Sequence, residues 1–175
     1  PKYPLHNFQK YIKDRSLALL LNPEKTGRQM IHMPTGSGKT KTAMEIVSDV
    51  IRSKIALGGF ESTATIIWMA HNTELCEQAV ATFTNTWEIR GDVSVNIVKF
   101  YETFNLNEQW EPEGSNIVFA GFSKMTNAIK SPKVDLIPVL QQLRENVDMV
   151  IVDEAHFSMA KEWNKSIEYF MFNSK

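Results

Sequence analysis

The residues with the clearest chemical potential form one short run, His32-Met33-Pro34-Thr35-Gly36-Ser37-Gly38-Lys39-Thr40. Its two glycines allow the backbone to curl tightly, so that successive N–H groups can point at one anion. Lys39 adds a positive charge, and Thr40 adds a hydroxyl suited to Mg²⁺. A strand-like apolar segment leads into the run and a helix-patterned segment leaves it, which directs the positive end of a helix dipole at the same place. We interpret residues 34–40 as a loop that holds the phosphates of a nucleoside triphosphate.

One position of this loop departs from the strict phosphate-loop pattern. Met33 stands where G-x-x-x-x-G-K-[ST] asks for glycine. The alternative interpretation is a Gly/Ser turn that merely links a strand to a helix. That alternative does not explain why Lys39 and Thr40 follow directly at the start of the helix, so we favour nucleotide binding by Pro34, Thr35, Gly36, Ser37, Gly38, Lys39 and Thr40.

A second chemical group, Asp153-Glu154-Ala155-His156, follows the apolar segment 149–152. Ligands of open α/β sheets bind at the carboxyl ends of the strands, so this fold would bring both acids near the phosphates. One carboxylate can serve Mg²⁺, and the other can orient or deprotonate the attacking water. We expect His156 to respond to the γ-phosphate. The alternative is a helix N-terminus with acids in its first turn and a structural histidine.

The elements that must position these groups alternate between strands and helices. Helical spacing over residues 5–21 places Phe8, Ile12 and Leu19 on one face, and an amphipathic helix runs from Lys39 to the glycines at 58–59. Strands are expected at 30–33, 63–70, 93–100, 116–122 and 149–152.

Several of these strands are apolar on both sides. The pattern therefore predicts an α/β fold, with a mostly parallel sheet covered by helices on both faces. Between the strands, Asn72 or Thr73 can cap one helix, Ser123 can cap a second, and Pro138 suits the first turn of a third.

The bulk properties limit the function classes. The chain has 175 residues, of which 43% are hydrophobic and 22% are charged, which suits one soluble domain over 1–175. The net charge of −1 provides no broad basic field, so a nucleic-acid contact would have to be local. The apolar runs are too short to span a bilayer and no signal peptide is visible, so we expect no membrane association. A lone cysteine, Cys76, fits a packed thiol in a reducing cytoplasmic setting.

These motifs together resemble a known family. Residues 34–40 resemble motif I of superfamily-2 helicases, and residues 153–156 resemble motif II, the DEAH box. Leu5-x-x-Phe8-Gln9 resembles the signature that opens the restriction-enzyme (ResIII-like) branch, which tolerates an apolar residue at Met33. Residues 66–79 look like motif Ia and residues 117–125 like motif Ib.

The resemblance implies the first RecA-like, P-loop NTPase domain of a motor that uses ATP and Mg²⁺. Gln9 would contact adenine, Thr40 and Asp153 would hold Mg²⁺, and Glu154 would activate water. Lys39 and His156 complete the implied catalytic set. The implied contacts to the nucleic-acid backbone are His71, Asn72, Gly121, Ser123 and Lys124.

Two departures bear on the nucleic acid that the motor would use. Gly121 stands where motif Ib usually has threonine, and His71-Asn72-Thr73 replaces the proline, threonine and arginine of DEAD-box RNA helicases. Together with Gln9, the second departure favours duplex DNA over RNA, and translocases of restriction, repair or phage-defence type. An RNA-directed motor stays open, as does a nucleotide-binding regulatory or assembly module without turnover.

The family also implies parts that the sequence does not show by Lys175. These are a strand with a Ser-Ala-Thr motif beside the phosphate-loop strand, and a second RecA-like domain with the arginine fingers. We therefore expect an incomplete first motor domain that works with that second domain and with nuclease or specificity subunits. Because an arginine finger is worth about 10³–10⁵ in rate, we expect residues 1–175 alone to hydrolyse ATP poorly.

Overall fold

The computed structural model describes residues 4–22, 29–59, 62–154 and 166–170. The chain forms two compact units, one of residues 1–62 and 81–93 and the other of residues 63–80 and 94–175. The boundary falls within a single helix, α3 (Thr73–Arg90), so both units contain part of it.

The second unit contains a four-stranded sheet in the order β2-β3-β1-β4, and every pair of neighbours is parallel. β1 pairs with β3 in the register Thr65↔Asn116 and with β4 in the register Ile66↔Met149. All six residues of β1 are buried, as expected for a central strand covered on both faces. The strands are β1 (Thr65–Ala70), β2 (Asn96–Phe100), β3 (Asn116–Gly121) and β4 (Met149–Val152).

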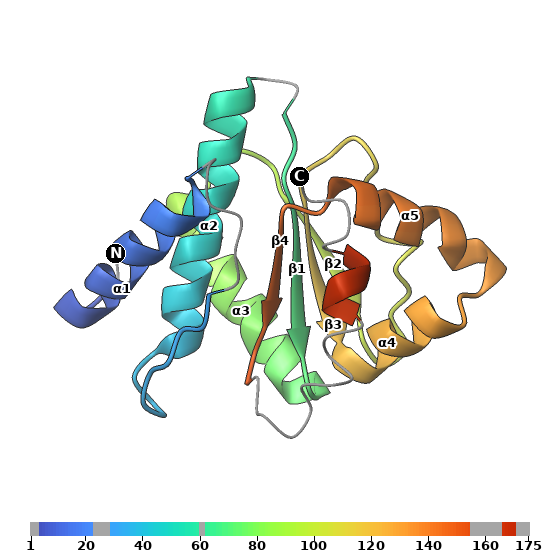
Figure 1. Ribbon diagram of the computed structural model, residues 1–175, viewed down its shortest axis with the longest axis horizontal. Helices are drawn as coiled ribbons and strands as arrows, with labels where there is room; N and C mark the ends of the chain where they lie inside the picture. Colours follow the sequence, from blue (N-terminus) through green and yellow to red (C-terminus); the bar gives the residue numbers. More distant parts are fainter. Residues whose placement is uncertain (1–3, 23–28, 60–61, 155–165, 171–175) are drawn as a thin grey trace. The chain divides into compact units, whose positions relative to one another are not determined.

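Helices cover both faces of this sheet. On one face, Ile67 and Met69 of β1 share a hydrophobic core with residues of α4 (Phe122–Lys130) and α5 (Ile137–Asn146). Figure 1 shows these two helices on the same side of the sheet. A short 3₁₀ helix, η1 (Val134–Leu136), leads into α5. On the other face, Lys99 of β2 reaches Glu77 in the second turn of α3. The predicted α/β fold with a parallel sheet and helices on both faces is confirmed.

The first unit is helical, and α1 (Asn7–Leu20) lies beside α2 (Lys39–Gly58) (Figure 1). α2 is amphipathic as predicted, since Met44, Val47 and Ile51 are fully buried. The predicted apolar face of α1 is only partly buried: Ile12 is half-buried, whereas Phe8 is 47% exposed and Leu19 is 37% exposed. The buried residues of α1 are polar instead, namely Gln9 and Ser16. The spacing of residues shows which of them share a face of the helix, but contacts with the rest of the unit decide which face is buried.

The strand predicted at 30–33 is not formed, because residues 29–34 have no regular secondary structure. A strand exists only through ladder hydrogen bonds to a neighbouring strand. Within the described ranges, the only ladders are those of the four-stranded sheet β2-β3-β1-β4, and residues 30–33 join none of them. An apolar run can therefore have the composition of a strand and still form none, because it has no partner strand.

Three local predictions also meet the structure. Asn72 caps α3, because its Oδ1 accepts the Leu75 N–H at 2.9 Å. Pro138 lies in the first turn of α5, as predicted. Ser123 does not cap α4, because that helix already begins at Phe122.

The outer edge of β2 is closed by a side chain. The Gln109 amide donates from Nε2 to the Lys99 carbonyl at 3.1 Å, and its Oε1 accepts the Lys99 N–H at 3.0 Å. The side chain thus occupies the backbone groups that an edge strand would otherwise offer to another strand. No helix in the described part of the chain is both long and apolar enough to cross a membrane.

Candidate functional site

The loop at residues 34–38 is a tight turn that leads directly into α2. The Pro34 carbonyl accepts the Ser37 N–H at 3.2 Å and the Ser37 hydroxyl at 2.6 Å. Gly36 and Gly38 have φ angles of 77° and 80°, a left-handed region that side chains disfavour. The Gly38 carbonyl then accepts the Thr42 N–H at 2.9 Å, which starts the helix. Lys39 and Thr40 are half-buried in its first turn.

Gln9 of α1 fastens this loop to the first helix. Its Nε2 donates to the Ser37 carbonyl at 2.8 Å, and its Oε1 accepts the His6 N–H at 2.7 Å. Only one orientation of the amide satisfies both partners, so the side chain is fixed as well as buried (4% exposed). A Cβ on Gly38 would lie 2.5 Å from Gln9 Nε2, so glycine is required there by contact as well as by φ.

A pocket of about 490 Å³ opens beside this contact, within the range typical of small-molecule sites. The His6 and Phe8 rings are stacked at its side, 5.9 Å apart and 5° from parallel. Exposed flat rings next to an oriented amide suit a planar, hydrogen-bonding ligand. The lining residues are Pro4, Leu5, His6, Phe8, Gln9, Gly36, Ser37, Gly38 and Lys41.

Sequence reasoning named Gln9 in this pocket but gave His6 no role. The available signal was the position of His6 three residues before Gln9 in the same signature. That spacing makes His6 the N-cap of α1 and Gln9 its third residue, a capping-box arrangement.

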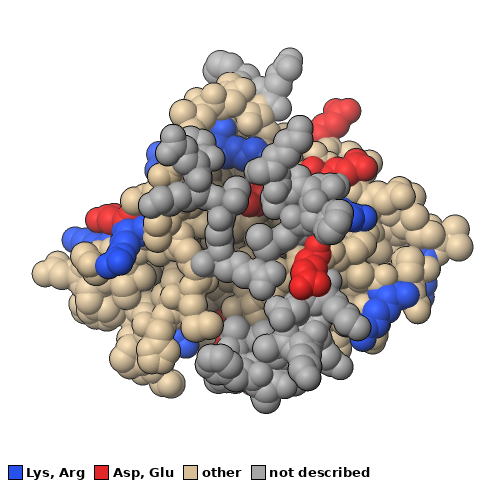
Figure 2. All heavy atoms as spheres, viewed as in Figure 1, with Lys and Arg blue, Asp and Glu red and all other residues tan. Residues whose placement is uncertain are grey.

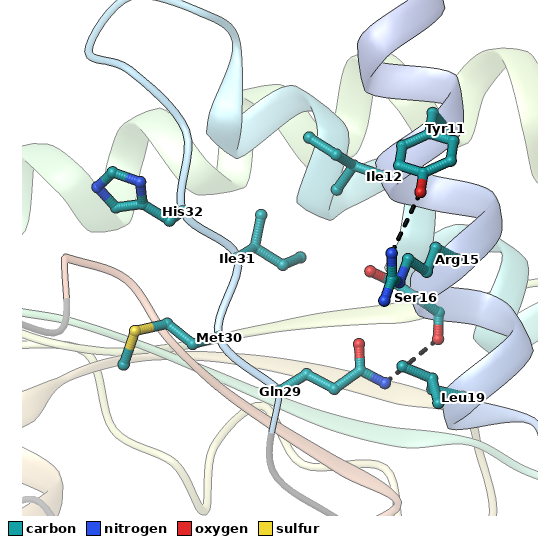
Figure 3. A pocket seen from close by; sticks show the side chains of 9 residues that line it. All are labelled: Tyr11, Ile12, Arg15, Ser16, Leu19, Gln29, Met30, Ile31 and His32. Carbon is teal, nitrogen blue, oxygen red and sulfur yellow. Dashed lines mark hydrogen bonds between the residues drawn. The ribbon is translucent and has the colours of Figure 1, made fainter.

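A second pocket of similar volume lies between α1 and residues 29–32 (Figure 3). Two contacts cross or border it: Arg15 donates to the Tyr11 hydroxyl at 3.1 Å, and Gln29 donates to the Ser16 carbonyl at 3.4 Å. None of the predicted site residues lines it. Of these two contacts, only the Gln29–Ser16 hydrogen bond joins α1 to the segment that precedes the loop, because Tyr11 and Arg15 both belong to α1.

The two acids lie at the carboxyl end of β4. The Asp153 N–H donates to the Met69 carbonyl at 2.9 Å, and the Glu154 N–H donates to Asp153 Oδ1 at 3.0 Å. Glu154 has a φ of 52°, a conformation that costs a non-glycine residue about 1 kcal/mol. Strain of this kind gathers at functional positions, so it agrees with a role for Glu154. His156 lies outside the described residues.

The start of α3 lies close to these acids. Cys76 is fully buried, and burial raises the pKa of its thiol to about 11, with the negative charges of Glu77 and Asp153 adding to the effect. Cys76 therefore stays a neutral, packed thiol at physiological pH. Asp153 and Glu154 belong to the second unit and the glycine loop to the first, so their meeting stays a prediction.

The predicted nucleic-acid contacts differ in what they offer. Lys124 Nζ donates to the carbonyls of Glu102 at 2.8 Å and Phe104 at 2.6 Å, and burial lowers its pKa. It therefore holds the loop after β2. Asn72 is used as a helix cap, whereas His71 and Ser123 are exposed.

Gly121 is fitted tightly at the same edge of the sheet. A Cβ there would lie 3.3 Å from the Cβ of Tyr101, so a threonine at this position would crowd the start of that side chain. The departure from motif Ib thus has a packing reason.

Acidic groups outweigh basic ones along this carboxyl edge. Glu77 accepts the Tyr101 hydroxyl at 2.6 Å and both oxygens accept Lys99 at 3.2 Å, and the Tyr101 hydrogen bond lowers the pKa of Glu77. The face in Figure 2 likewise shows basic and acidic side chains side by side, with no continuous basic area among the described residues. Any contact to phosphates here would rely on exposed polar groups such as His71 and Ser123.

The described residues contain no cluster of three or more histidine, cysteine, aspartate or glutamate side chains that could hold a metal. Thr40 and Asp153 each carry an oxygen donor of the kind that Mg²⁺ prefers, and their sharing of one ion stays a prediction.

The parallel sheet with helices on both faces defines an α/β domain of RecA-like kind. The family model for the Type III restriction enzyme, res subunit, matches residues 2–174, and the chain belongs to this family. It is thus a helicase-like domain of superfamily 2, of the type found in restriction enzymes.

Among solved structures, the chain is similar to a nuclease-deletion mutant of the Type ISP restriction-modification enzyme LlaGI, determined in complex with a DNA substrate mimic. The identity is 16% and the TM-score 0.46, over 86% of this chain and 12% of that one. No curated protein matches the chain.

Proposed function

We propose that this chain is the ATP-binding first motor domain of a superfamily-2 translocase or helicase that acts on duplex DNA. The observation that supports it best is the placement of Gln9. One amide joins the first turn of α1 to the glycine loop at 2.8 Å and borders a pocket of about 490 Å³. A pocket that joins a base-reading amide to a glycine loop fits a nucleotide better than a turn that only links two elements.

The residues present fit ATP and Mg²⁺. Residues 34–40 would hold the phosphates with backbone N–H groups and the Lys39 ammonium, and Gln9 would hold the base. Thr40 and Asp153 would hold Mg²⁺, Glu154 would orient and deprotonate water, and His156 would respond to the γ-phosphate. ATP supplies the phosphoryl group and Mg²⁺ supplies charge neutralisation.

The work on DNA is proposed to need more than this chain. A second RecA-like domain would supply arginine fingers, and nuclease or specificity subunits would be further partners. Within the described ranges, β4 pairs with β1 and has no strand on its other side. We propose that the strand with the Ser-Ala-Thr motif, and beyond it residues 30–33, extend the sheet there in the intact motor.

The test is ATP turnover by the intact protein with and without duplex DNA. We expect stimulation by DNA, and a loss of about 10²–10⁴ in turnover for Glu154→Gln. Glu88→Gln is the matched control, because Glu88 is an exposed residue of α3. Stimulation by RNA alone would transfer the proposal to an RNA motor. Binding without any turnover would leave a regulatory module.

A further inference from the structure

The fully buried residues of α1, which packs beside α2, are polar. Its buried residues are Gln9 and Ser16, whereas its large apolar side chains Phe8 and Tyr11 are 47% and 64% exposed. Ile12, Leu17 and Leu20 are half-buried, but no apolar side chain of α1 is fully buried, so apolar packing alone holds the helix weakly. Its polar contacts therefore contribute to where it lies.

Two such contacts join α1 to α2 or its loop. Gln9 bonds the Ser37 carbonyl, and Lys13 Nζ meets Asp49 Oδ2 at 2.9 Å. Gln9 and Lys13 are four residues apart, so they share one face of α1 and lie about 6 Å apart along it. One contact alone would let α1 pivot about Ser37, whereas two contacts fix its rotation and its slide.

Asp49 is well suited to be the fixed end of this second contact. Its side chain is 17% exposed, and that of Lys13 is 15% exposed. Its other oxygen, Oδ1, pairs with Arg90 at the end of α3 and lies 4.0 Å from Arg52. Arg90 also pairs with Glu45 of α2 at 2.7 Å. The Asp49 carboxylate is therefore fixed by Arg90 of α3 and by Arg52 of its own helix, independently of its contact with Lys13.

We propose that the Lys13–Asp49 ion pair is a positioning device that sets the base selectivity of the nucleotide pocket without touching the nucleotide. It fixes the rotation of α1 and so the place of the Gln9 amide. A site that reads a base by hydrogen bonds rejects the wrong base only while its polar groups stay in register. The inference rests on the proposed nucleotide site.

The test is the ratio of affinities for Mg·ATP and Mg·GTP in wild type and Lys13→Met, measured by displacement of a fluorescent ATP analogue. Lys13→Met removes only the α1 half of the pair and leaves the Arg90–Asp49 pair intact. We expect the preference for ATP to fall roughly three- to five-fold, as for loss of a half-buried ion pair. Affinity for inorganic tripolyphosphate should not change, because the loop's own turn and α2 hold the phosphates.

Lys10→Met is the matched control, because it makes the same substitution at an exposed position of α1. Lys13→Gln, with a polar replacement, should reproduce the loss of selectivity. An unchanged ATP:GTP ratio in both Lys13 variants would overturn the inference, as would an equal loss of affinity for all three ligands. A wild-type chain that binds no nucleotide, or binds ATP and GTP equally, would instead contradict the proposed function.

Discussion

Gly38→Ala tests the contact between the loop and α1 in two ways at once. The residue has a φ of 80°, which costs alanine about 1–2 kcal/mol. The new Cβ would also lie 2.5 Å from Gln9 Nε2 and displace its bond to Ser37, worth about 0.5–1.5 kcal/mol. We expect the free energy of unfolding to fall by about 1.5–3.5 kcal/mol, with ATP affinity falling as well.

Gly36→Ala is a matched control. Its φ of 77° is nearly the same, but a Cβ there meets nothing within 4 Å. Gly36→Ala should lower the free energy of unfolding only by the backbone strain of a left-handed alanine, about 1–2 kcal/mol. Urea unfolding of both variants, alone and combined with Gln9→Ala, gives the coupling energies. We expect about 0.5–1.5 kcal/mol between Gly38 and Gln9 and none between Gly36 and Gln9. Equal costs for the two glycine variants would refute the reasoning.

Three further predictions concern the second unit. Cys76 is buried, and the pKa of its thiol is raised to about 11, so it should resist iodoacetamide in the folded chain until the pH approaches that value. It should react when urea unfolds the chain. Rapid labelling of the folded chain at neutral pH would contradict the burial of this thiol. The pKa of Glu77 is lowered in the folded state, so this contact stabilises the fold above the ordinary glutamate range and is lost as acid protonates the carboxylate. Tyr101→Phe should therefore narrow the difference in melting temperature between neutral and acid pH, and an unchanged difference would contradict this. Gln109→Ala frees the backbone groups of Lys99 at the edge of the sheet, so light scattering should detect faster aggregation than in the exposed-site control Gln141→Ala; equal rates would mean that the edge is protected by other means.

The sequence was most informative where the structural signal was local. The alternation of apolar strands with amphipathic helices predicted the parallel sheet, and the glycines at 36 and 38 predicted a tight loop before α2. Asn72 and Pro138 marked helix starts through their own backbone chemistry. Such signals depend on a few neighbouring residues, so one sequence contains them in full.

The sequence patterns were less informative where the structure depends on contacts between residues that are distant in sequence. The segment 30–33 is apolar enough for a strand, but no ladder partner lies beside it among the described residues. α1 has an apolar stripe, yet its fully buried residues are Gln9 and Ser16, and the Gln9 amide is held inward by its bond to the Ser37 carbonyl. The role of Lys13 was invisible for the same reason, since Asp49 is 36 residues away. Lys124 donates to the carbonyls of Glu102 and Phe104, which no local pattern predicts, and its contact with phosphates stays a prediction.

The central claim is that Gln9 and the glycine loop bind a nucleotide, and direct titration of the chain with Mg·ATP tests it most plainly. Lys39→Ala should weaken binding about ten- to hundred-fold, as expected for loss of charge-assisted contacts worth about 1.5–3 kcal/mol. Lys10→Ala, at an exposed position of α1, should bind as the wild type does. A wild-type chain that binds no Mg·ATP, or a Lys39→Ala chain that binds it equally well, would contradict the account.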